Sequence, residues 1–170
     1  MEKQLLTAME KLSIRNATPG DIATIMDLIR QLAVYEKLEH MITGTDAMMH
    51  TALFGARPSC ECVIAEENGK PVGFALYFTT FSTFLCKPGL YLEDLFVIPA
   101  TRGKGYGKAL LQYLAQLAKS RDCGRFEWRV LDWNEPSIQF YKSLGASVMP
   151  EWHLVRMTEA EIAVLAGNGG

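Results

Sequence analysis

The chain has 170 residues, is 49% hydrophobic and carries a formal net charge of -2 at pH 7. This length supplies apolar side chains for one packed core and few for a second, so we expect a single domain. The 17 Lys and Arg residues are balanced by 19 Asp and Glu residues, so the basic excess on which non-specific nucleic-acid binding depends is absent. We therefore expect no nucleic-acid partner.

The first residues fit neither a signal peptide nor a membrane span, because charged side chains surround a brief apolar stretch. We expect a tail over residues 1–11, one domain over residues 12–157, and a short helix with a flexible tail over residues 158–170. The same pattern predicts a cytoplasmic protein with no membrane partner. The four cysteines lack zinc-finger spacing and are expected to be buried free thiols, so no metal site is predicted.

In chain order, the first predicted element is a short strand near residues 12–16. A helix is predicted next, because Thr18 offers an N-cap, Pro19 suits the first helical position and Asp21 is acidic. Its apolar residues recur at intervals of three and four, which gives the helix one apolar face: Ile22, Ile25, Leu28, Ile29 and Leu32. A second helix is predicted from Thr45 to Phe54, ended by Gly55.

The middle of the chain is predicted to form strands of one sheet. Branched and aromatic residues at 62–66 and 71–81 flank the turn signal of Asn68 and Gly69, which predicts a hairpin. Residues 91–98 form the next predicted strand, residues 105–119 a helix with one leucine-rich face, and residues 125–131 another strand.

The last part of the chain mixes both element types. Asn134 is placed to cap a helix that has Pro136 in its first turn and Gly145 after its end. Residues 151–157 are predicted to return to strand, and Thr158 with Glu161 is predicted to open a terminal helix. Helices mixed with hairpins around one sheet predict an α/β domain of mixed α+β character.

The most informative stretch is the strand at 91–98, because a glycine-rich turn and a helix start follow it. Glycines let backbone N–H groups approach an anion closely, and a helix N-terminus adds roughly half a positive charge, so the turn suits a pyrophosphate. Three cations crowd the same turn, which disfavours a purely geometric role for its glycines: Arg102, Lys104 and Lys108.

Two other phosphate-binding loops are excluded by spacing. Gly103, Gly105 and Gly107 lack the extra residue that the dinucleotide fingerprint places before its last glycine. A Walker loop needs Ser or Thr after its Gly-Lys pair, where this chain has Ala109.

The pattern Arg-x-x-Gly-x-Gly, filled by Arg102, Gly105 and Gly107 after a strand that ends in Phe-Val, resembles the acetyl-CoA loop of the GNAT acetyltransferases. Residues 90–94, 133–137 and 140–142 are similar, in order and separation, to the spermidine/spermine and thialysine acetyltransferase branch. The resemblance runs from residue 14 to about residue 155. It implies the GNAT fold, a mostly antiparallel twisted sheet of six to seven strands with helices on both faces. It also implies acetyl-CoA as co-substrate, no metal, and a homodimer.

Acetyl transfer to an amine needs a neutral nitrogen, whereas an ammonium of pKa ~10.4 keeps its proton at neutral pH. The resemblance implies that Glu93 removes this proton, directly or through water, and that Tyr141 protonates the leaving thiolate. Asp94 is expected to point to the opposite face of the strand from Glu93 unless a bulge intervenes. The alternatives are a solvated strand acid for Glu93 and a core aromatic for Tyr141.

The resemblance further implies two sets of binding residues. The set for acetyl-CoA is Leu95, Phe96, Val97, Arg102, Gly103, Lys104, Gly105, Tyr106, Gly107, Lys108, Asn134 and Ser137. The set for the amine is Tyr35, Glu36, Glu127, Trp128, Arg129 and Glu151. Within the second set, Glu36 and Glu151 have a plain surface role as their alternative, and Trp128 a core role.

The acceptor is expected to be a small-molecule primary amine. Relatives that act on spermidine carry an aspartate in the loop before residue 91, whereas residues 81–87 of this chain end in the cation Lys87. Residues 82–84 and 130–134 are more similar to the thialysine branch, whose acceptor carries an amino-acid head. Arg129 or Lys87 is expected to receive the carboxylate of that head. We therefore expect a thialysine-like amine to be preferred over a polyamine such as spermidine or spermine.

Two rival functions have to be compared with acetyl transfer. The first is a non-catalytic module that binds acyl-CoA and regulates, in which the glycine loop persists without acetyl transfer. The second is a nucleotide-binding P-loop protein, which would need a Walker Ser or Thr and magnesium.

Overall fold

The structure is a computed structural model that describes residues 12–167. The chain divides into two compact units, Met1–Arg129 and Val130–Gly170, and each is described by itself. The predicted tail at residues 1–11 and the last three residues lie outside the described residues. The predicted single domain over residues 12–157 stays a prediction.

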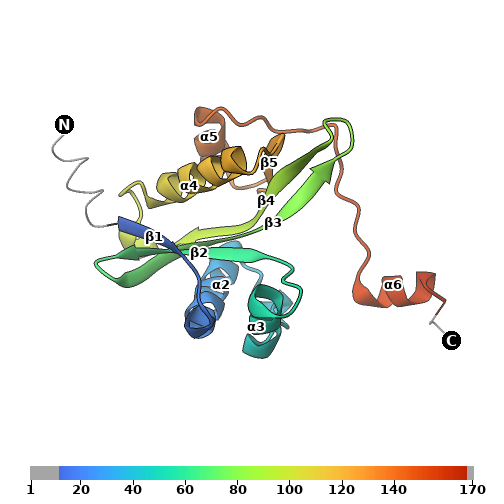
Figure 1. Cartoon of the computed structure of the whole chain (residues 1–170), viewed down its shortest axis with the longest axis horizontal. Coiled ribbons are helices and arrows are strands. Elements are labelled where there is room, and N and C mark those ends of the chain that lie inside the picture. The colour runs from blue at the N-terminus through green and yellow to red at the C-terminus, as the bar shows by residue number, and fades with distance from the viewer. Residues whose placement is uncertain (1–11, 168–170) are drawn as a thin grey trace. The chain divides into compact units, whose positions relative to one another are not determined.

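The first unit is built on a five-stranded sheet in the order of the sequence (Figure 1). The strands are β1 (Leu12–Asn16), β2 (Glu61–Glu67), β3 (Lys70–Ser82), β4 (Lys87–Val97) and β5 (Arg125–Trp128). The first four strands pair antiparallel, and β4 pairs with β5 in parallel. Asn68 and Gly69 both have positive φ between β2 and β3, as a two-residue hairpin turn requires.

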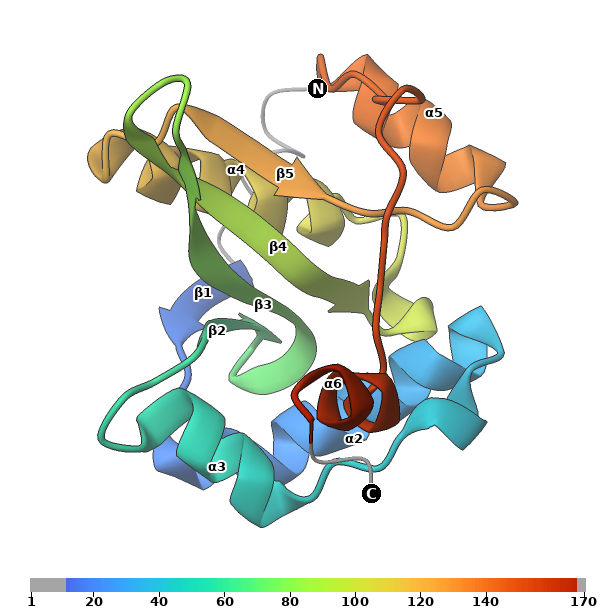
Figure 2. The same ribbon diagram turned by 90° about the vertical axis from the view of Figure 1, so that its right-hand side faces the viewer.

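Helices cover both faces of this sheet (Figures 1 and 2). On one face lie α2 (Ile22–Glu36) and α3 (Asp46–Phe54), and on the other face lies α4 (Tyr106–Ser120). Three short 3-10 helices precede or follow them: η1 (Pro19–Asp21), η2 (Glu39–Met41) and η3 (Pro99–Thr101). The predicted mixed α/β class is therefore confirmed.

The core beneath α2 joins the predicted apolar face of that helix to the sheet. Ile25 is completely buried and belongs to one cluster with Ile64, Phe74 and Phe96. On the opposite face, Leu110 and Leu114 of α4 are also completely buried. Burying a side chain of this size contributes about 1.5–3 kcal/mol, so these residues fix the two helices on the sheet.

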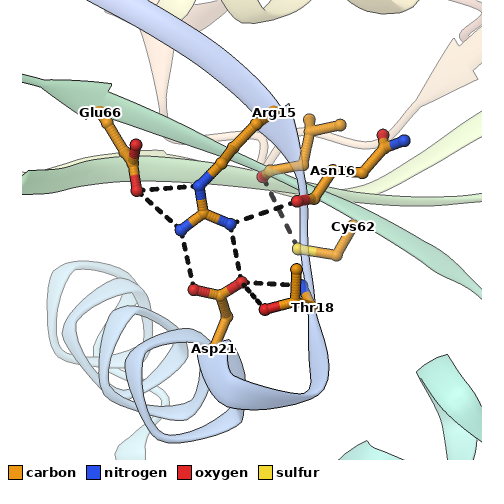
Figure 3. A network of polar contacts seen from close by, with 7 residues as sticks. Arg15, Asn16, Thr18, Asp21, Cys62 and Glu66 are labelled. Atoms are coloured by element: carbon orange, nitrogen blue, oxygen red, sulfur yellow. Dashed lines mark hydrogen bonds and ion pairs between the residues drawn. The ribbon is translucent and has the colours of Figure 1, made fainter. Parts of the chain in front are cut away.

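A polar network around Arg15 holds the start of α2 against the sheet (Figure 3). The Arg15 guanidinium donates to both carboxylate oxygens of Asp21, at 2.8 and 2.9 Å, and to Glu66 Oε1 at 2.7 and 2.9 Å. Asp21 also accepts from the backbone N–H of Thr18 at 2.7 Å, which is the predicted helix-start signal. The guanidinium keeps the pKa of Asp21 far below its ordinary value, so this carboxylate stays charged.

The second unit contains α5 (Glu135–Ser143) and α6 (Glu159–Leu165). Asn134 and Thr158 occupy the N-cap positions, as predicted, but the Asn134 side chain makes no capping hydrogen bond. The predicted strand over residues 151–157 is wrong, because these residues pair with no strand in the described part of the chain. The sheet therefore has five described strands and not six or seven, and β5 ends at Trp128, before the predicted residue 131.

The cysteines are free thiols, as predicted, but they are not all buried. Cys62 is buried within the core under α2, whereas Cys86 at the β3–β4 turn is exposed.

Candidate active site

The glycine loop joins η3 to α4 and has the backbone shape that an anion site needs. Gly103 and Gly105 have φ of 80° and 85°, a region that other residues rarely adopt. Gly105 is the N-cap of α4 and has no side chain to cap the helix, so the N–H groups of the first turn point out of the helix end without partners from the helix. Among residues 12–167, no backbone carbonyl accepts from the N–H of Gly103 or Gly105.

Arg102 opens this loop and lies against the sheet face that carries α2. Its Nε donates to the carbonyl of Val97 at 3.1 Å. Its guanidinium lies 4.7 Å from the ring centroid of Tyr35 and 5.6 Å from that of Phe96. The structure thus brings the loop together with the end of α2, two segments that the resemblance assigned to different ligands.

Lys104 and Tyr106, on either side of Gly105, contact one acid of β2. The Lys104 ammonium lies 2.7 Å from Glu67 Oε1, and the Tyr106 hydroxyl donates to the same oxygen at 2.5 Å. Lys108 is exposed on the first turn of α4.

The strand β4 contains a bulge at Glu93. Asp94 pairs with Leu76 while Leu92 pairs with Tyr77, so Glu93 is an extra residue with no partner in β3. Leu92 and Leu95 occupy one face of the sheet, and the two acids between them lie together on the other face, toward α2. The bulge that the sequence analysis left open is therefore present, and Asp94 does not point to the face opposite Glu93.

The bulge gives the two acids different environments. Glu93 is exposed to solvent, whereas Asp94 is only partly exposed. Burial, and then the charges of Glu93 and Glu36, raise the pKa of Asp94 to about 6. Burial also raises the pKa of Glu36, at the end of α2. The acids of β4 and α2 thus form a region of concentrated negative charge, which favours a cationic guest.

Beyond Leu92, one edge of β4 is open. The parallel ladder with β5 ends where Leu92 meets Trp128, so no described strand pairs with β4 on that side from Glu93 to Val97. Leu95, Phe96 and Val97 lie on this segment, and the Val97 carbonyl already accepts from Arg102. Unpaired strand edges bind extended ligands through backbone hydrogen bonds.

The predicted amine-binding residues Glu127 and Trp128 lie on two faces of β5, and Arg129 directly follows this strand. Glu127 pairs with Tyr91, and the Arg129 guanidinium lies 5.6 Å from the Tyr91 ring centroid. Tyr91 pairs with Phe78, two residues from the partner of Asp94, so it lies on the face of the two acids. Trp128 pairs with Leu92 and contacts Phe126, on the face of α4.

The exposed end of the β3–β4 hairpin carries Lys87. Its ammonium lies 2.7 Å from Asp122 Oδ1 in an ion pair. Of the two cations predicted to receive a carboxylate, Arg129 lies over Tyr91, whereas Lys87 is ion-paired with Asp122.

Four predicted site residues belong to the second unit. Asn134 is 8% exposed, its side chain does not cap α5, and its Oδ1 has no hydrogen-bond partner among the described residues. A buried carbonyl oxygen without a donor is a place where a ligand N–H can bind. Ser137 and Tyr141 are four residues apart on α5 and share one side of it. Glu151 is exposed.

Two residues near the site were not predicted from the sequence. Tyr91 has a signal that was available, since it alternates with Glu93 on the strand. Glu67 has none, because its partners are 37 and 39 residues away in the chain.

Within residues 12–167, no group of three or more His, Cys, Asp or Glu residues is placed to hold a metal ion. In the same residues, no helix has the length and apolar character needed to cross a membrane.

Comparison with known proteins gives the family. Residues 22–146 match the acetyltransferase (GNAT) family. The chain is 35% identical to a thialysine N-epsilon-acetyltransferase of Sus scrofa, over 94% of this chain and all of that protein. It is 33% identical to an L-ornithine N5-acetyltransferase of Arabidopsis thaliana, over 85% of this chain and 83% of that protein. Among solved structures, an integron cassette protein of V. cholerae is 26% identical with a TM-score of 0.77, and the match covers 92% of this chain and 98% of that one.

The family match covers well over half of the chain, and two relatives above 30% identity align along most of their length. The chain therefore belongs to the GNAT family of acetyl-CoA-dependent N-acetyltransferases, in the branch of the diamine and thialysine acetyltransferases.

Proposed function

We propose that the chain transfers the acetyl group of acetyl-CoA to the side-chain amine of a small lysine-like molecule, with Glu93 as base and Tyr141 as acid. The observation that carries the proposal is the bulge in β4. It presents Glu93 beside Asp94 on the strand that leads through η3 into the glycine loop. A base and an anion-binding loop on one continuous segment suit a reaction between an amine and a phosphate-bearing thioester.

The base has a defined task. Freeing an ammonium of its proton at pH 7 costs roughly 4–5 kcal/mol, from about three factors of ten at 1.36 kcal/mol each. Glu93 is exposed and can accept this proton directly or through water. The neighbouring charge of Asp94 helps to hold the incoming ammonium before it loses the proton.

The acid acts on the leaving group. A thiol has an ordinary pKa near 8.5, so a phenol placed against the sulfur can supply the proton as the C–S bond breaks. Tyr141 is the candidate, and Ser137 on the same side of α5 is a candidate contact for the pantetheine end.

The residues of the loop fit the diphosphate of acetyl-CoA. Backbone N–H groups from Gly103 to Lys108 and the positive end of α4 would contact its oxygens. The open edge of β4 from Leu95 to Val97 suits the amides of the pantetheine arm, and the buried Oδ1 of Asn134 needs a donor.

The acceptor is proposed to be an amino acid with an amine on its side chain. Arg129 lies over Tyr91, where its planar guanidinium can bind a carboxylate through two hydrogen bonds. Lys87 is held by Asp122 and is not needed for this role. The names of the two relatives point the same way, because thialysine and ornithine are both amino acids with a side-chain amine.

Steady-state kinetics of the Arg129→Gln variant test this acceptor. With thialysine, KM should rise about tenfold, the factor that about 1.4 kcal/mol represents. With 1,4-diaminobutane, which has no carboxylate, KM should stay unchanged. An equal rise for both amines would remove Arg129 from the head-group site.

The rival function of a non-catalytic module has a direct test as well. Calorimetric binding of CoA without acetylation of any amine in a broad panel would support that module. A homodimer stays a prediction from the family resemblance, which light scattering at micromolar concentration would test.

A further inference from the structure

We propose that Glu67, at the end of β2, is a positioning residue for the glycine loop and sets its affinity for the diphosphate of CoA. The inference rests on the proposed function, since it assumes that the loop from Arg102 to Lys108 binds that diphosphate. It adds a residue far from the loop in sequence to the machinery of the site.

A single carboxylate oxygen joins two points of the loop. Glu67 Oε1 accepts from the Lys104 ammonium at 2.7 Å and from the Tyr106 hydroxyl at 2.5 Å. Lys104 and Tyr106 stand directly before and after Gly105, the N-cap of α4. The acid therefore holds both sides of the residue at which the loop becomes a helix.

The sheet holds the backbone of Glu67 in a fixed position. Glu67 is the last residue of β2, pairs with Leu12 of β1 and Lys70 of β3, and its side chain is 18% exposed. Tyr106 is 4% exposed, and its ring is held in the core at the first position of α4. Burial and the bond to Glu67 raise the pKa of Tyr106 to about 12, so the hydroxyl keeps its proton and remains a donor at neutral pH.

The loop depends on such anchors because its glycines provide none. Gly103 and Gly105 have positive φ and no side chains, and α4 begins without a side-chain cap. The conformation that exposes backbone N–H groups is thus fixed from outside, by Arg102 on the Val97 carbonyl and by Lys104 and Tyr106 on Glu67.

The charges of Glu67 and Lys104 determine how Glu67 affects the binding of the diphosphate. A lone carboxylate beside a diphosphate would repel it, but the Lys104 ammonium balances Glu67. Direct attraction is then left to the positive end of α4, to Lys108 and to the exposed N–H groups. Glu67 consequently affects diphosphate binding by fixing the conformation of the loop. Its ion pair with Lys104 helps to hold that conformation.

Calorimetric titration with CoA tests the inference on the full-length protein. Glu67→Ala and Tyr106→Phe should each raise the Kd for CoA about tenfold, which is the effect of losing roughly one hydrogen bond to a charged group. Glu67→Gln keeps an acceptor oxygen and should stay within about threefold of the wild-type Kd. If Glu67→Ala does not fold, Tyr106→Phe, which keeps the buried ring, decides alone.

Two further measurements separate positioning from plain structural support. At saturating acetyl-CoA, kcat of Glu67→Ala should stay within about twofold of the wild-type value. The kcat/KM for acetylpantetheine, which has no diphosphate, should also be unchanged. A matched control is Glu61→Ala at the other end of β2, which breaks an ion pair with Arg121 at 2.6 Å and should leave the Kd for CoA unchanged.

The possible failures are distinct. Wild-type Kd in folded Glu67→Ala and Tyr106→Phe would overturn the inference alone. An equal loss with acetyl-CoA and acetylpantetheine would overturn it too, because the defect would not lie at the diphosphate. If the wild-type protein itself did not bind CoA, the proposed function would fail first, and this inference with it.

Discussion

Replacing Asp94 by Asn tests whether the bulge in β4 forces a second carboxylate into a partly buried and negatively charged place. In the folded chain, burial and the charges of Glu93 and Glu36 raise the pKa of Asp94 to about 6. Because this value lies above the ordinary 3.8, the ionised group weakens the fold as the pH rises from about 4 to 6, and the full penalty is present above that range. Asn has nearly the same shape and no charge, so the variant avoids the penalty.

The size of the effect follows from the two pKa values. The difference between 3.8 and about 6 corresponds to roughly 3 kcal/mol at pH 7.5, at 1.36 kcal/mol for each factor of ten in the acid constant. Solvent screens part of this, so we expect the variant to gain about 2 kcal/mol in free energy of unfolding. For a chain of this length, that gain raises Tm by about 4–8 °C. At pH 4.5 the acid is largely protonated, and the gain should fall below about 1 kcal/mol.

Thermal unfolding followed by circular dichroism at the two pH values measures this difference. Asp132→Asn, at an exposed position, is the matched control and should change stability by less than about 0.5 kcal/mol at either pH. A lower Tm for the Asp94 variant at pH 7.5, or the same change in Tm at both pH values, would refute the reasoning.

Three further predictions concern the loop, the acid and the helix start. Gly107→Val should weaken CoA binding at least about tenfold by calorimetry, because it obstructs the N–H groups. Its Cβ would lie 3.9 Å from Leu95, so the fold should tolerate it, and Gly44→Val, with nothing within 4 Å, is its control. Tyr141→Phe should lower kcat about 10²-fold while the Kd for CoA is unchanged, and an unchanged kcat would exclude Tyr141 as the acid. Asp21→Asn should lower the free energy of unfolding by about 2 kcal/mol at pH 7 in urea titrations. Because the pKa of Asp21 is depressed, the wild-type advantage should shrink as the pH falls below about 4; a constant advantage would contradict this.

Most elements were predictable because their signals are local. Thr18 bonds to Asp21 at the start of α2, Thr45 accepts from the N–H of Met48 in α3, and Asn68 with Gly69 makes the turn between β2 and β3. Each signal needs only neighbours within a few residues. The glycine loop could be located for the same reason, since its function depends on consecutive residues.

The arrangement of the acids could not be predicted in this way. Two adjacent acids, Glu93 and Asp94, interrupt the alternation of apolar and polar residues between Leu92 and Leu95. Only the register against β3 shows which residue is the extra one. Contacts across the sheet set that register. The contact between Arg102 and Tyr35 likewise depends on where α2 ends relative to η3.

The predicted strand at residues 151–157 failed for a related reason. Its apolar side chains suit a strand, yet Trp152 is 73% exposed and Val155 is 87% exposed. A strand is stabilised by hydrogen bonds to a neighbouring strand, and amino-acid composition does not show whether such a neighbour is present. In the described part of the chain, that partner is missing for these residues.

The central claim is that this enzyme acetylates a lysine-like amine, and side-by-side kinetics with acetyl-CoA test it most directly. Thialysine, ornithine, spermidine and spermine are compared at pH 7.5 under identical conditions, with the acetylated products identified by mass spectrometry. The account predicts that kcat/KM for thialysine exceeds that for spermine by about tenfold, the worth of one charge contact of about 1.4 kcal/mol. A higher kcat/KM for spermine would contradict the proposed head-group site at Arg129 and indicate a polyamine acetyltransferase.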